Sequence, residues 1–188
     1  MNLRTVVITR NKTFNVRTLH MILKLNILCI KNGIVNDISF VNDDVESRKN
    51  AFNIPYNRLV WIEYGVSLDN DSLITLVRPI PVPSYTSIIY PAVKEGVDWN
   101  IFKEKSIQDS SEPTYQYGMS FDTDVSECMY DMYYKVITSE NPKIWLVDND
   151  TIDDSILRGA SLAYVKADVT VAYSYECFGN ILISSSIQ

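Results

Sequence analysis

Acidic residues recur directly after the apolar runs of this sequence. At three places two carboxylates, adjacent or one residue apart, come after an apolar run. At a fourth place a single glutamate does. The acids concerned are Asp43 and Asp44, Glu63, Asp122 and Asp124, and Asp148 and Asp150. Because the chain has one histidine and no CxxC pair, these carboxylates favour a hard, oxygen-liganded cation such as Mg²⁺, Mn²⁺ or Ca²⁺. Such a cation can bridge a diphosphate and neutralise the charge of a departing nucleotide.

The same acids also have a structural interpretation, which the sequence leaves open. Acid pairs at strand ends commonly cap helices or form turns. Asp148 and Asp150 precede a predicted helix, which favours capping, whereas no helix directly follows Asp122 and Asp124. Glu63 could likewise be a solvated acid that opens a turn before the glycine two places later.

Few other residues offer chemistry. Arg10 and Lys12 follow the first predicted strand and could meet a phosphate or form a solvated loop. The three tryptophans are predicted to be core or wall residues rather than stacking platforms. The sequence contains no GxGxxG, P-loop or GxSxG pattern, so dinucleotide-binding, P-loop and serine-hydrolase functions have no motif support. The only histidine, His20, lies inside a predicted helix and is a poor basis for a catalytic triad.

The elements that must position these residues alternate between strand and helix in the first half of the chain. Apolar β-branched runs predict strands over 5–9, 38–41 and 59–62, the last with both faces buried. Helices are predicted over 14–30, with Thr13 as N-cap, and from Asp44 to Ala51. The expected buried face of the first helix consists of Phe14, Val16, Leu19, Ile22, Leu23, Ile27 and Ile30. This order predicts an α/β fold with a mixed, mainly parallel central sheet and flanking helices.

The second half is less regular. Helices are predicted over 72–77, capped by Asp69 or Asp71, over 97–105 and over 151–163. Strands are predicted over 85–90 and 169–175, and a hairpin over 133–138 and 143–147. Residues 106–119 form a long polar stretch of the kind that often serves as a lid or binding segment.

Composition limits the class of protein. A chain of 188 residues with 46% apolar and 21% charged residues suits one packed domain. A net charge of −6 argues against a nucleic-acid partner, because there is no basic excess to displace counterions. Three widely spaced cysteines indicate a reduced compartment. The sequence has no membrane-span or signal-peptide pattern, so a cytoplasmic location is expected.

Three phrases resemble a known family. They are LVWIEYG at 59–65, YPAVKEGVDW at 90–99 and FDTDV at 121–125. Together with the order of strands and acids, they resemble the GT-A-type nucleotide-sugar glycosyltransferases, in particular the glycosyltransferases of large DNA viruses. The resemblance extends from the first strand to about Asp148. It implies one GT-A-like domain over 1–188, with a nucleotide-binding half at about 1–78 and an acceptor-side half at about 79–188.

The resemblance also implies partners and roles. The donor would be a UDP-sugar or GDP-sugar held with Mn²⁺ or Mg²⁺, and the acceptor a glycan or glycoprotein, in the host cytoplasm if the protein is viral. By position, Glu63 would begin the metal motif, and Asp122 and Asp124 are the candidates for the catalytic base. The donor-binding residues would be Thr9, Arg10, Lys12, Asp43, Asp44 and Tyr64.

One departure from the pattern keeps other functions open. Gly65 stands where an Asp-x-Asp motif would have its second acid. A second hypothesis is therefore a catalytically inactive GT-A-like binding or assembly module. A third is another metal-dependent nucleotide enzyme, such as a nucleotidyltransferase, which would release pyrophosphate rather than a nucleoside diphosphate.

Overall fold

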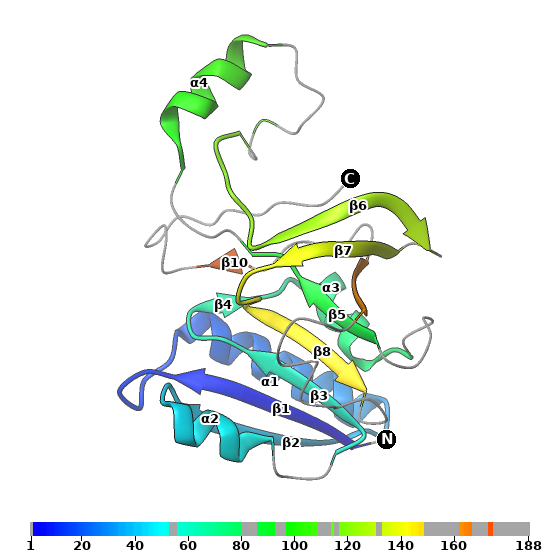
Figure 1. Ribbon diagram of the computed structural model, residues 1–188. Coiled ribbons are helices and arrows are strands. Elements are labelled where there is room, and N and C mark those ends of the chain that lie inside the picture. Colours follow the sequence, from blue (N-terminus) through cyan, green and yellow to red (C-terminus); the bar gives the residue numbers. More distant parts are fainter. Residues whose placement is uncertain are drawn as a thin grey trace.

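The computed structural model is an α/β fold built on one mixed sheet (Figure 1). It describes residues 2–52, 56–79, 86–92, 97–108, 114, 117–130, 133–148, 162–166 and 173–174. Among these residues, no helix combines the length and apolar character needed to cross a membrane. The sheet contains strands from both halves of the chain, and the division into donor and acceptor halves stays a prediction.

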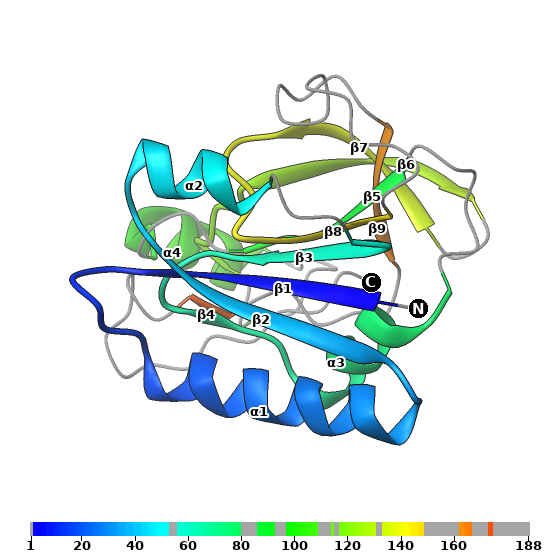
Figure 2. The same ribbon diagram turned by 90° about the horizontal axis from the view of Figure 1, so that it is seen from below.

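The first three strands form a parallel unit. Strand β1 (Asn2–Thr9) lies between β2 (Val35–Asn42) and β3 (Arg58–Ile62), and both pairings are parallel. Helix α1 (Val16–Lys31) connects β1 to β2, and α2 (Val45–Ala51) connects β2 to β3. The two helices cover opposite faces of the sheet (Figure 2). The chain therefore moves to one side of β1 and then returns to the other, which makes β1 a topological switch point.

The rest of the sheet mixes both directions. Strand β8 (Ile144–Asp148) runs antiparallel between β3 and β5 (Thr86–Tyr90). Beyond β5 follow β9 (Leu162–Lys166), β7 (Tyr133–Ser139) and β6 (Thr123–Tyr130). Of the neighbouring pairs in this eight-stranded sheet, three are parallel and four antiparallel. The predicted mixed sheet is confirmed, but parallel pairs are not its majority.

Four further elements lie outside the main sheet. Strand β4 (Val66–Ser67) pairs with β10 (Tyr173–Ser174), and α3 (Asn70–Val77) packs beside α1. Helix α4 (Trp99–Ile107) stands away from the sheet at the top of Figure 1 and has no buried residue. Trp99 is 65% exposed, so its prediction as a core or wall residue is wrong.

Two apolar clusters fill the two faces of the sheet. Leu3 and Val7 of β1 join the cluster under α1 and α3, while Val6 and Ile8 join the cluster under α2. This alternation follows from the two-residue period of a strand. All five residues of β3 are buried, as the continuous apolar run predicted.

Helix α1 lies where it was predicted but buries a different face. Its N-cap is Asn15, not Thr13, whose hydroxyl instead donates to the carbonyl oxygen of Arg10. The residues that face the core are Thr18, Met21, Ile22, Leu25 and Cys29. Of the residues expected to be buried, Val16, Leu23, Ile27 and Ile30 are between 52% and 78% exposed. The helix has two apolar stripes at helical spacing, and periodicity alone does not say which one meets the sheet.

Several predicted boundaries hold, and others change. Asp44 caps α2 and Asp69 caps α3, as predicted. The expected hairpin is wrong, because β7 pairs with β6 and β9 while β8 pairs with β3 and β5. Strand β6 was not predicted. The predicted helix over 151–163 lies mostly outside the described residues, and its last two residues belong to β9.

Candidate functional site

The carboxyl ends of β1, β2 and β3 lie at one edge of the sheet. From β1 the chain goes to β2 on one side and then to β3 on the other, so this is a topological switch point. In open α/β sheets, ligands bind in the crevice outside the carboxyl ends of the strands at such a point. Arg10 follows β1, Asp43 follows β2 and Glu63 follows β3. The backbone N–H of Asp43 donates to Thr9 O at 2.9 Å, which fixes the exit of β2 against that of β1.

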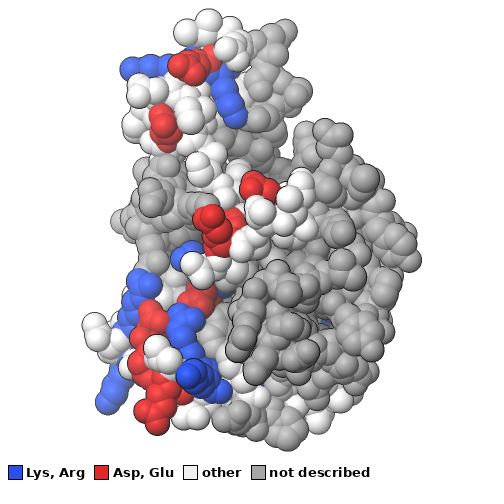
Figure 3. Space-filling view, in the orientation of Figure 1, with Lys and Arg blue, Asp and Glu red and all other residues white. Residues whose placement is uncertain are grey.

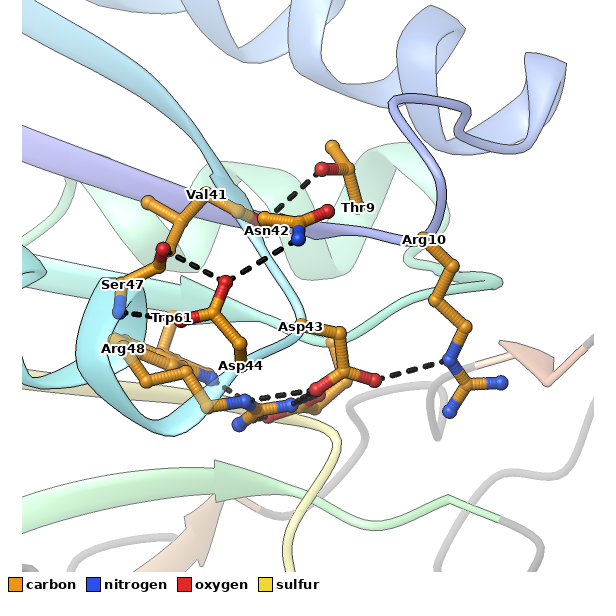
Figure 4. A network of polar contacts seen from close by, with 10 residues as sticks. Thr9, Arg10, Val41, Asn42, Asp43, Asp44, Ser47, Arg48 and Trp61 are labelled. Carbon is orange, nitrogen blue, oxygen red and sulfur yellow. Dashed lines mark hydrogen bonds and ion pairs between the residues drawn. The ribbon is translucent and has the colours of Figure 1, made fainter.

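Arg48, from α2, connects two of these acids. It donates to Glu63 from Nη1 to Oε1 at 2.8 Å and from Nη2 to Oε2 at 2.7 Å. It also donates to Asp43 Oδ1 from Nε at 2.9 Å and from Nη2 at 2.7 Å. One guanidinium therefore binds the two carboxylates that follow β2 and β3, and Figure 4 shows Arg48 directed toward Asp43. Paired N–H donors of this kind fix the orientation of both acids.

Glu63 has a third donor inside the protein. The indole Nε1 of Trp61 donates to its Oε1 at 2.8 Å. The Trp61 ring stacks against both Phe52 and Trp145, with ring centroids 4.8 and 5.7 Å away, and the Arg48 guanidinium carbon lies 5.8 Å from its centroid. The side chain of Glu63 is therefore fixed by neighbours that are themselves packed. The prediction that Trp61 and Trp145 are core or wall residues is confirmed.

Arg10 enters the site from the loop between β1 and α1. Its Nε donates to Asp43 Oδ2 at 3.0 Å, and its guanidinium lies 5.1 Å from the centroid of the Tyr64 ring. Asn11 and Lys12 both have left-handed backbones, with φ of 50° and 60°. Backbone hydrogen bonds in both directions between Arg10 and Thr13 close this two-residue turn. A left-handed lysine is unfavourable, so the turn holds Arg10 in place at the expense of local strain.

The charges of this cluster are mutually compensated. Burial raises the pKa of Asp43, but hydrogen bonds from Arg48 and Arg10 outweigh it and hold that pKa below its ordinary value. The hydrogen bond to Glu63 raises the pKa of Arg48, which burial opposes. Basic and acidic side chains accordingly alternate over this part of the surface, at the lower left of Figure 3.

Two predicted donor residues have structural roles. Asp44 accepts hydrogen bonds from the Ser47 N–H and hydroxyl, both at 2.8 Å, and from Asn42 Nδ2 at 3.2 Å. The pKa of Asp44 is lowered, first by the backbone N–H of Ser47. Thr9 is 6% exposed and donates to Val41 O. Of the two acids after β2, Asp43 therefore faces the cluster and Asp44 caps the helix.

The two candidate bases have different surroundings. Asp122 is 3% exposed, and its Oδ1 accepts from Ala92 N at 3.0 Å and from Thr123 Oγ1 at 2.8 Å. Its Oδ2 has no hydrogen bond within the described part of the chain. Burial raises the pKa of Asp122 and outweighs the hydrogen bonds from Ala92 and Thr123, which act in the opposite direction. Asp124 is exposed and accepts from Thr138 Oγ1 at 2.8 Å.

Asp122 shares the edge of the sheet with Glu63, and Asp148 does not. The Glu63 N–H donates to Lys143 O at 2.8 Å, and Lys143 is also a neighbour of Asp122. Asp148 pairs with Arg58 at the opposite, amino end of β3, because β8 is antiparallel. The position of Asp150 lies outside the described residues.

The described residues do not fit a divalent cation. No group of three or more His, Cys, Asp or Glu side chains among them is arranged to hold a metal ion. Both oxygens of Glu63 accept from nitrogen donors. Gly65 is buried and has φ of 77°, in the left-handed region. This conformation favours glycine over any residue with a side chain, so it disfavours the second acid of an Asp-x-Asp motif.

The site is thus a compensated arginine–carboxylate cluster at the switch point of an α/β sheet. The chain matches no protein-family model, no curated protein and no solved structure in the comparisons.

Arg48 and Trp61 were not among the predicted site residues. The sequence holds only a weak signal for Arg48. It follows Asp43 by only five residues, but this is not the three- or four-residue spacing that places two side chains on one face of a helix. Its contact with Glu63 depends on how α2 packs against β3, which the sequence pattern does not encode.

Proposed function

We propose that the chain is a GT-A-type glycosyltransferase that binds a UDP-sugar or GDP-sugar at the switch point between β1 and β3. The observation that carries this proposal is the gathering of Arg10, Asp43, Glu63 and Tyr64 at that point. Switch-point crevices are the ordinary nucleotide sites of open α/β sheets. Arginine suits the diphosphate, because its planar donors match phosphate oxygens in pairs.

The chemistry divides between two groups of residues. Arg10 and Lys12, on the turn after β1, would stabilise the leaving nucleoside diphosphate while the sugar develops oxocarbenium character. For an inverting reaction, the proton of the acceptor hydroxyl passes to a carboxylate, and Asp122 and Asp124 are the candidates. The raised pKa of Asp122 favours such a role. Asp124 is the solvent-exposed alternative. A glycan or glycoprotein is the proposed acceptor.

Calorimetric titration with UDP-glucose, GDP-mannose and their free nucleotides tests this function. Binding of one nucleotide family is expected, and it should be lost in Arg10→Glu. Arg17→Glu, on the exposed part of α1, is the matched charge-reversal control and should bind as the wild type does. Failure of every nucleotide and nucleotide-sugar to bind would exclude the proposal.

A second candidate is a binding or assembly module of the same shape that does not catalyse transfer. It is favoured by the engagement of Glu63 with Arg48 and Trp61 and by the glycine at position 65. Product analysis separates the two candidates. A transferase releases nucleoside diphosphate from the sugar nucleotide that it binds, whereas a binding module leaves that donor intact.

A further inference from the structure

Arg48 lies between two carboxylates, where a metal-dependent enzyme would hold its cation. Asp43 and Glu63 follow β2 and β3, the two strands that flank β1, and Arg48 donates two hydrogen bonds to each of them. The side chains of Asp43 and Glu63 are 29% and 18% exposed, so both acids need a nearby positive charge. The guanidinium supplies that charge as a built-in part of α2.

Arg10 completes the charge balance. It contacts the second oxygen of Asp43 and has a side chain that is 49% exposed. Two arginines and two carboxylates sum to zero formal charge, and so would one divalent cation with the same two carboxylates. The cluster therefore has the formal charge of a two-carboxylate metal site without a metal ion.

We propose that Arg48 and Arg10 together replace the divalent cation, so that this site binds a nucleoside diphosphate in a metal-independent way. The inference rests on the proposed function, because it concerns the same ligand and the same edge of the sheet. Arg10, the more exposed of the two, contacts the diphosphate. Arg48 keeps Asp43 and Glu63 neutralised, so that neither carboxylate repels the phosphate oxygens.

This assignment differs from a purely structural ion pair in what it predicts for ligand binding. A structural pair only connects α2 to β3, and its loss would lower stability without changing any dependence on metal. If Arg48 substitutes for a cation, its removal leaves the carboxylates of Asp43 and Glu63 without that positive charge. Those acids repel an anion, and they provide the oxygen ligands that a hard divalent ion prefers.

The test is calorimetric titration of the wild-type protein with UDP and with GDP, once in EDTA and once in Mn²⁺. We expect one nucleotide to bind with the same dissociation constant, within about threefold, in both buffers. In EDTA, Arg48→Gln should weaken binding by more than about tenfold, while Lys49→Gln, its neighbour on α2, should not. Mn²⁺ should restore part of the binding of Arg48→Gln, because Asp43 and Glu63 are then available to it.

The outcomes separate this inference from the function on which it rests. Binding of the wild-type protein only with Mn²⁺ would overturn the inference and leave the proposed nucleotide function intact. No nucleotide binding in either buffer would overturn both. Metal-independent binding by the wild type together with unchanged binding by a folded Arg48→Gln would also overturn the inference, because Arg48 would then form only a structural ion pair. Circular dichroism and the more conservative Arg48→Lys establish whether a loss of binding in Arg48→Gln reflects unfolding.

Discussion

Arg48 donates two parallel hydrogen bonds to Glu63, from Nη1 to Oε1 at 2.8 Å and from Nη2 to Oε2 at 2.7 Å. The pair connects α2 to the exit of β3, and both partners also belong to the cluster around Asp43 and Trp61. Both carboxylate oxygens of Glu63, for which the family resemblance implies a role as metal ligand, therefore accept hydrogen bonds from a guanidinium. The stability and the ligand preferences of this edge of the sheet both depend on that contact.

Removing Arg48 should destabilise the fold. Arg48→Ala leaves Asp43 and Glu63 next to each other without their shared cation, and we expect a loss of about 1–3 kcal/mol in the free energy of unfolding. Urea denaturation at neutral pH measures the change. Lys49→Ala removes an exposed cation from the same helix and should cost less than about 0.5 kcal/mol. Equal losses in the two variants would contradict a specific role for the contact.

Asp43 should make the protein sensitive to acid. Its pKa is lower in the folded protein than its ordinary value of about 3.9, because the hydrogen bonds from Arg48 and Arg10 exceed the effect of burial. The stabilisation is present above the ordinary value and is lost as the pH falls through the folded value. Wild-type protein should thus be more stable than Asp43→Asn at pH 7, and the difference should shrink below pH 4. A constant difference across this range would disprove the linkage.

The turn after β1 should become more stable with glycine at position 12. Lys12 has φ of 60°, and a left-handed non-glycine residue costs roughly 1–2 kcal/mol. Glycine recovers this strain but loses more backbone entropy on folding, so Lys12→Gly should gain about 0.5–1 kcal/mol. Thermal denaturation gives the comparison. Asn11→Gly should gain less, because asparagine tolerates the left-handed region.

The two apolar stripes of α1 should respond differently to truncation. Leu25 is fully buried, and Leu25→Ala should lose about 2–5 kcal/mol. Leu23 is 53% exposed on the same helix, and Leu23→Ala should lose less than about 1 kcal/mol. The two variants have identical chemistry, so chemical denaturation of each isolates the effect of burial. Similar losses would mean that α1 lies on the sheet in a different rotation.

Asp122 should weaken the fold as the pH rises. Because burial raises its pKa, its contribution to stability is full below the ordinary value of about 3.9 and is lost as the pH rises through the folded value. Melting temperatures of Asp122→Asn and wild type, measured from pH 3.5 to pH 8, should diverge in favour of the variant toward high pH. Asp124→Asn removes an exposed carboxylate and serves as the matched control. No divergence would show that Asp122 is not held in a desolvated position.

The sequence itself determined most of the local structure. Asp44 and Asp69 cap α2 and α3, β3 is buried along its whole length, and α1 and the first three strands lie near their expected positions. These features depend on interactions within a few residues, such as a side-chain oxygen that meets the N–H groups of a helix start. They are therefore encoded in neighbouring residues and can be inferred from them.

Only the tertiary structure decided how these pieces meet. It set β8 antiparallel beside β3, which moved Asp148 to the opposite edge of the sheet from Glu63. It also decided which of the two apolar stripes of α1 packs against the sheet. It brought Arg48 into contact with both Asp43 and Glu63. Strand direction, helix rotation and ion pairing between distant elements depend on packing against residues far along the chain, and no local pattern carries that information.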